Sequence, residues 1–120
     1  MSDNKNFIYF DNKFILGKSS QLNDVYDVLL YSRYDIEKIK IPSFIKIIAE
    51  YSFGYTNNLK EVTFSNDSKL VLFEKSTFFF SKIESTQIPS KVNKIRYGCF
   101  KGASQLKSIV ISSENKNFKY

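Results

Sequence analysis

The sequence predicts an α/β repeat fold, a short solenoid in which about four strands stack into one parallel sheet. The first observation is that Ile-Pro-Ser occurs at 41–43 and at 88–90, an offset of 47 residues that pairs like residues along most of the chain. The second is a shorter pattern inside each unit, which returns after 23 or 24 residues. Repeats of this length are typical of solenoids that contribute one strand per turn.

The shorter pattern is Leu or Ile, two variable residues, then two apolar residues separated by one variable residue. Its four copies are IEKIKI (36–41), LKEVTF (59–64), IESTQI (83–88) and LKSIVI (106–111). Alternation of this kind predicts strands with one buried and one exposed face, and the pattern is that of a leucine-rich repeat. In the third copy Thr86 stands where the others have an apolar residue.

An aromatic residue precedes each of the four strands, namely Tyr31, Phe53, Phe78 and Phe100. Pro42 and Pro89 directly follow the first and third strands, where a missing N–H ends a ladder at little cost. The apolar residues after each proline suit a short helical or turn-like return path. The repeats are therefore expected over 31–111.

Residues 1–30 contain more chain than one connection between strands needs. Two apolar runs within FIYFDNKFILGK flank Asp11-Asn12-Lys13, which offers turn chemistry. We expect a β-hairpin insertion that caps the first coil or, less favoured, projects as a binding element.

The chain opens on SDNKNFIY and closes on SENKNFKY, and the 47-residue offset places the closing phrase on Asp67, Lys69 and Phe73. This repetition predicts that 112–120 begins a further, truncated repeat. It also predicts that the chain is one segment of a longer array of coils.

Two phrases, IPSFIKIIAEYSFGYTNNLKEVTF and IPSKVNKIRYGCFKGASQLKSIVI, resemble the BspA-like leucine-rich repeats. The resemblance covers about residues 25–111, with Ser52 and Cys99 in place of the usual alanine before phenylalanine. It implies a right-handed solenoid of the surface-antigen type, involved in adhesion and partner binding. A cell-surface location is suggested by this resemblance alone, and the sequence leaves the compartment open.

The composition argues against catalysis and against a bound cofactor or metal. The chain has no histidine and one cysteine, so the commonest general base and a structural zinc site are both missing. Carboxylate pairs can be drawn from Asp24 with Asp27 and from Glu50 with Glu61, but their spacing is that of solvated charges. Cys99 is expected to be a small packing residue.

The working surface is expected on the concave face of the sheet, where parallel strands hold outward side chains in a rigid row. A protein or glycan partner of unknown identity suits this polar row. The candidate partner-binding residues are Lys38, Lys40, Glu61, Thr63, Ser85, Gln87, Ser108 and Val110.

An alternative function rests on charge, since the chain carries a formal net charge of +6. Residues 88–111 contain five basic residues and no acidic one, which suits nucleic acid or an anionic glycan. We favour the sheet face over this basic module. The candidate residues of the basic module are Lys91, Lys94, Arg96, Lys101 and Lys107.

Overall fold

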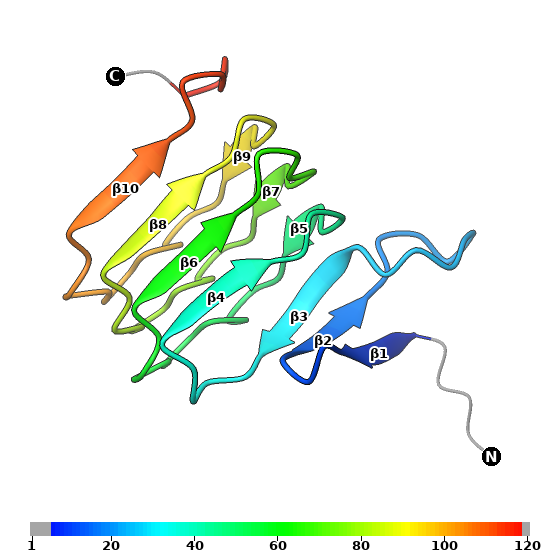
Figure 1. Ribbon diagram of the computed structural model, residues 1–120, viewed down its shortest axis with the longest axis horizontal. Helices are drawn as coiled ribbons and strands as arrows, with labels where there is room; N and C mark the ends of the chain where they lie inside the picture. Colours follow the sequence, from blue (N-terminus) through cyan, green and yellow to red (C-terminus); the bar gives the residue numbers. More distant parts are fainter. Residues whose placement is uncertain (1–5, 119–120) are drawn as a thin grey trace.

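The computed structural model describes residues 6–118 and shows two sheets joined by short turns (Figure 1). The sheet formed by the repeats is parallel, in the order β10-β8-β6-β4. Each of its strands falls inside one of the four ranges expected from the sequence. They are β4 (Lys38–Ile41), β6 (Glu61–Phe64), β8 (Ser85–Ile88) and β10 (Ser108–Ile111).

The second sheet has six strands in the order β1-β2-β3-β5-β7-β9. Its return-path strands β5, β7 and β9 pair in parallel with each other, and β3 pairs in parallel with β5. The bounds are β1 (Phe7–Phe10), β2 (Phe14–Gly17), β3 (Val28–Ser32), β5 (Ile47–Ile48), β7 (Leu72–Phe73) and β9 (Lys94–Ile95).

The α part of the expected α/β class is wrong, because residues 6–118 contain no helix. Each return path is a two-residue strand followed by turns. Its backbone N–H groups donate to the neighbouring coil, as when Val71 N donates to Lys46 O (2.9 Å) and Asn93 N to Val71 O (3.0 Å). Backbone groups that are paired between coils have no need of the bonds within a helix.

The expected β-hairpin is present as β1 and β2, which pair in antiparallel register. Asp11 and Asn12 adopt φ of 55° and 54° in its turn, and Lys13 N donates to Phe10 O. The hairpin continues through β3 into the second sheet, so it covers the first coil instead of projecting from it. The expected boundary between residues 30 and 31 falls inside β3.

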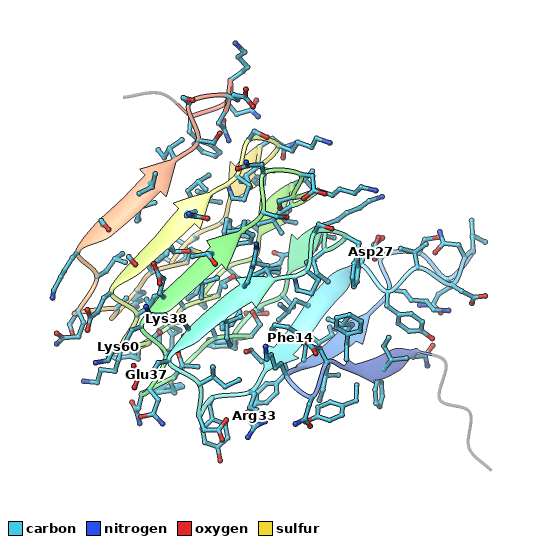
Figure 2. The ribbon with its side chains drawn as sticks, in the orientation of Figure 1. Phe14, Asp27, Arg33, Glu37, Lys38 and Lys60 are labelled. Atoms are coloured by element: carbon cyan, nitrogen blue, oxygen red, sulfur yellow. The ribbon has the colours of Figure 1, made fainter. Side chains whose placement is uncertain are left out.

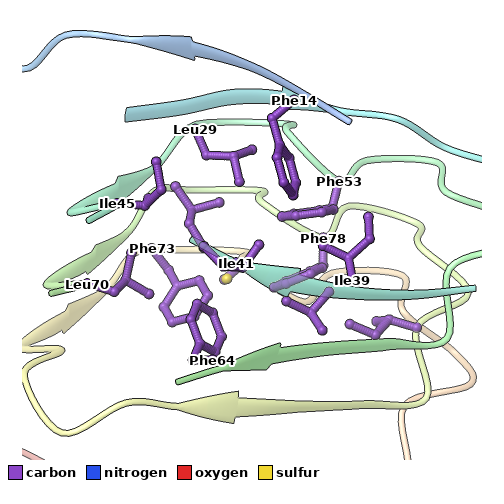
Figure 3. Close-up of a cluster of buried hydrophobic side chains, with 14 of the residues drawn as sticks. Phe14, Leu29, Ile39, Ile41, Ile45, Phe53, Phe64, Leu70, Phe73 and Phe78 are labelled. Atoms are coloured by element: carbon purple, nitrogen blue, oxygen red, sulfur yellow. The ribbon is translucent and has the colours of Figure 1, made fainter. Parts of the chain in front are cut away.

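The core lies between the two sheets and includes a row of phenylalanine rings (Figure 3). Phe78 stacks on Phe53 and on Phe100, with ring centroids 5.2 Å apart in both pairs. Tyr31, expected in the same row, is instead 47% exposed, because the next residue of β3, Ser32, points inward. Phe14 of the hairpin is fully buried at the Phe53 end of the cluster in Figure 3.

The closing phrase is tied to the coil before it by a buried asparagine. Asn115 Nδ2 donates to the carbonyl oxygens of Pro89 (2.8 Å) and Val92 (3.1 Å). Residues 2–5 of the first copy of the phrase, and Lys119 and Tyr120 of the last copy, lie outside the described residues. That 112–120 begins a further repeat stays a prediction.

Within 6–118 there is also no helix that could cross a membrane.

Candidate binding surface

The outward row of the four-stranded sheet is laid out as parallel pairing requires. Lys38 and Lys40 of β4 lie in register with Glu61 and Thr63 of β6, and the same holds between β8 and β10. The row runs from lysines at the β4 edge, where Figure 2 labels Lys38, to the 58% exposed Val110 at the β10 edge. All eight candidate side chains are exposed or half-buried.

The ladder between β6 and β8 is incomplete, and two side chains of β8 take its place. Backbone pairing covers the first two residues of each strand and stops at Val62 and Thr86. Beyond that point Gln87 Oε1 accepts a hydrogen bond from Phe64 N (2.8 Å), and Thr86 Oγ1 donates to Val62 O (3.3 Å). The buried Thr86, which replaces an apolar residue of the repeat pattern, is thus hydrogen-bonded between the coils.

A cleft of about 400 Å³ opens where these strands end. Its floor and walls combine Gln87 and Val110 from the outward row with hydroxyl, amide and carboxylate groups from the loops. Such a mixture of apolar and polar groups is what an orienting ligand site needs. The lining residues are Phe64, Ser65, Asn66, Gln87, Ile88, Pro89, Ser90, Val110, Ser112, Ser113 and Glu114.

The five basic candidates lie on different segments of one coil, and two of them are ion-paired. They are distributed around a whole coil, from the turn after β8 through β9 to the approach to β10. Arg96 Nε lies 3.0 Å from Glu74 Oε1, and Lys107 Nζ lies 3.7 Å from Glu84 Oε1. Acids of the preceding coil therefore neutralise two of the five, which the sequence of 88–111 alone did not reveal.

The carboxylates considered for catalysis all have structural partners. Asp27 is buried and accepts hydrogen bonds from Ser19 N (2.8 Å) and Ser19 Oγ (2.7 Å), and Asp24 pairs with Lys18. Glu50 pairs with Lys75 and Glu61 with Lys38. In residues 6–118 no group of three or more His, Cys, Asp or Glu side chains is placed to hold a metal ion.

Cys99 is buried beside Thr77 in the stack of coils. Burial raises the pKa of the thiol to about 12, so the reactive thiolate is disfavoured. The thiol packs as a small apolar group. Ser52 lies at the equivalent position 47 residues, or two coils, earlier, and its buried Oγ makes no hydrogen bond within the described part of the chain.

A group that sequence reasoning missed consists of Tyr51, Tyr55, Phe79 and Phe80, which we call the aromatic corner. Phe79 packs edge to face with Tyr51, Tyr55 and Phe80, with ring centroids 5.5, 5.6 and 4.7 Å away. Three of the four rings are about half exposed or more. The available signal was the 47-residue offset, which aligns Tyr51 with Gly98 and Tyr55 with Gly102.

Comparison with known protein families agrees with the repeats. The model of the BspA type leucine rich repeat region matches residues 23–120 in six copies. A leucine rich cell surface protein from Faecalibacterium prausnitzii, solved as a crystal structure, is similar at 18% identity with a TM-score of 0.43. The similarity covers 93% of this chain and 41% of that one. A search of curated proteins found no match.

Proposed function

This chain belongs to the BspA-type leucine-rich repeat family, and from that premise we propose that it is a non-catalytic scaffold that binds a protein or glycan partner. The observation that carries the proposal is the outward row of the four-stranded sheet, which ends in the cleft between β6, β8 and β10. The same premise supports a place for the chain in an adhesive, surface-displayed array.

The row favours a partner that is recognised by shape and hydrogen bonds. Thr63, Ser85 and Ser108 present small hydroxyl groups, and the cleft adds Asn66, Gln87 and Glu114. Lys38 and Glu61 oppose each other with Nζ and Oε1 3.9 Å apart, which limits the net charge of the row. Such a surface suits a neutral glycan or an uncharged stretch of protein more than a phosphate backbone.

Val110 offers the cleanest test, because its side chain is exposed and borders the cleft. Labelled protein would be applied to a glycan array and to an array of purified extracellular proteins, and each hit would be titrated in solution. We expect Val110→Glu to weaken a true partner about tenfold or more by placing an unpaired charge in the contact. Ser113→Trp, which would fill the mouth of the cleft, should have a similar effect.

The control is Val25→Glu, since Val25 is also an exposed valine but lies in the loop before β3. It should leave partner binding unchanged. Gln87→Ala is unsuitable as a binding test, because it would leave Phe64 N without its acceptor and disturb the fold. If every hit bound Val110→Glu and Ser113→Trp as well as the original chain, the site would lie elsewhere.

The basic alternative stays a prediction with its own test. Lys91, Lys94 and Lys101 have no ion pair in the described part of the chain, so they are the charges available to a polyanion. Retention on heparin or single-stranded DNA that is lost in the triple variant to alanine and in moderate salt would support it. Absence of retention at low salt would rule out this alternative function.

A further inference from the structure

The aromatic corner is built on three equivalent turns, one per coil, at residues 51–55, 76–80 and 98–102. Backbone hydrogen bonds fix each turn on the next one. Tyr55 N donates to Phe79 O, and Phe80 N donates to Lys101 O, both at 2.8 Å. The side chains of the corner therefore start from a rigid frame.

The first and last residues of all three turns have positive φ. In the third turn both are glycines, Gly98 at 68° and Gly102 at 75°. In the first turn they are Tyr51 at 60° and Tyr55 at 56°, and the second ends on Phe80 at 52°. A bulky residue in this conformation is strained by about 1–2 kcal/mol relative to glycine. Strained residues of this kind cluster where side chains have a task beyond folding.

The rings are packed so that few flat faces remain open. Tyr55 and Phe80 stack with an interplanar angle of 8° and centroids 6.0 Å apart. Phe80 also lies close to Gly102, where an added Cβ would come within 2.7 Å of the ring. Stacking on a base or a pyranose needs a free ring face, and Phe80 already stacks on Tyr55 and lies close to Gly102. Ring edges and tyrosine hydroxyls remain, which are the groups that rigid protein-binding surfaces use.

The charges around the corner that have no ion pair among residues 6–118 have one sign. The three segments that carry it, 50–60, 74–84 and 96–107, contain three acids, and each of these is ion-paired with Lys75, Arg96 or Lys107. Lys60, Lys82 and Lys101 are exposed and have no ion pair among residues 6–118. Lys101 occupies the position in its turn that Phe79 occupies one coil earlier. Lys101, whose carbonyl oxygen accepts a hydrogen bond from Phe80 N, and Lys82, whose N–H donates to Thr56 O, thus place unneutralised positive charge on the coils that carry the rings.

We propose that the aromatic corner is a second binding surface, distinct from the sheet face, for a polypeptide segment with apolar anchor residues flanked by Asp or Glu. The half-exposed rings supply a hot-spot cluster, and the three lysines complement the acids. A second copy of this chain is a poor occupant, because its net charge of +6 would bring like charges together.

The test uses variants that copy the third turn. Tyr55→Gly with Phe80→Gly removes two rings and gives both positions the residue that their backbone conformation favours, so the chain stays folded. A phage-displayed random peptide library would be selected on the original chain, and the enriched peptides would be synthesised and titrated. Lys101→Glu tests the charge, and Tyr9→Ser, which removes an exposed tyrosine of the hairpin, is the matched control.

We expect the enriched peptides to combine acids with aliphatic or aromatic residues. Their affinity should fall about tenfold or more in the double glycine variant and in Lys101→Glu, and stay unchanged in Tyr9→Ser. Three outcomes would overturn the proposal: enrichment of no peptide, equal binding by the double glycine variant, or binding at the corner by a single-stranded DNA or oligosaccharide probe in place of peptides.

Discussion

Replacing Phe78 by alanine tests whether the phenylalanine row holds the coils together. Phe78 is fully buried and stacks on Phe53 and Phe100 at 5.2 Å each. Truncation of a buried phenylalanine costs about 3–5 kcal/mol, and stacked pairs contribute beyond area burial, so we expect a loss of about 4 kcal/mol. Because Phe78 bridges two neighbouring rings, the loss should affect the whole stack of coils.

Urea unfolding followed by far-UV circular dichroism would measure the change. With a slope of about 1.5 kcal/mol/M, the transition midpoint should fall by about 2–3 M. The matched control is Phe80→Gly two residues away, where a half-exposed ring is lost but backbone strain is relieved, so stability should change by less than about 1 kcal/mol. Equal losses for the two variants would refute the idea that the buried row, and not aromatic content in general, stabilises the solenoid.

Further outcomes follow from the surroundings of three single residues. Ser52→Ala should raise the free energy of unfolding by about 1 kcal/mol in chemical denaturation, because it removes a buried hydroxyl without a hydrogen-bond partner. Gln87→Ala should lower it by about 1–2 kcal/mol while Thr63→Ala does not, because only Gln87 satisfies the Phe64 N–H. Cys99 should resist alkylation near about pH 8 until the chain unfolds. Because folding raises its pKa, the neutral Cys99 thiol contributes to the free energy of unfolding. This contribution is fully present below the ordinary thiol pKa of 9.0 and is lost as the pH rises from there toward about 12.

Period and alternation were enough to predict the four-stranded sheet. Side chains of a strand alternate between faces, so Val62 and Phe64 had to point inward if Glu61 and Thr63 pointed outward, and the structure has this arrangement. The return path was not predictable in the same way. Ile45 and Ile48 are buried whether their segment is a helix or a short strand, and pairing with the neighbouring coils decided for the strand.

The outward row could be predicted because it is the complement of the buried positions. The cleft could not, since it depends on where the ladder between β6 and β8 stops. Thr86 and Gln87 appear in the sequence as one lost apolar residue and one outward polar residue. Only the structure shows that both side chains bind backbone groups of the coil before them.

Tyr55 and Gly102 show how an offset can point to a site as well as to a fold. A repeat forces equivalent residues into equivalent backbone conformations, so a glycine in one coil identifies the conformation that its partners in other coils must adopt. Where such a partner is aromatic, as at Tyr51, Tyr55 and Phe80, the fold imposes a positive φ that the residue itself does not favour. Disagreements of this kind are expected at functional sites, because residues chosen for folding alone would follow the glycine pattern of the third turn. The misfit therefore locates the aromatic corner independently of its exposure.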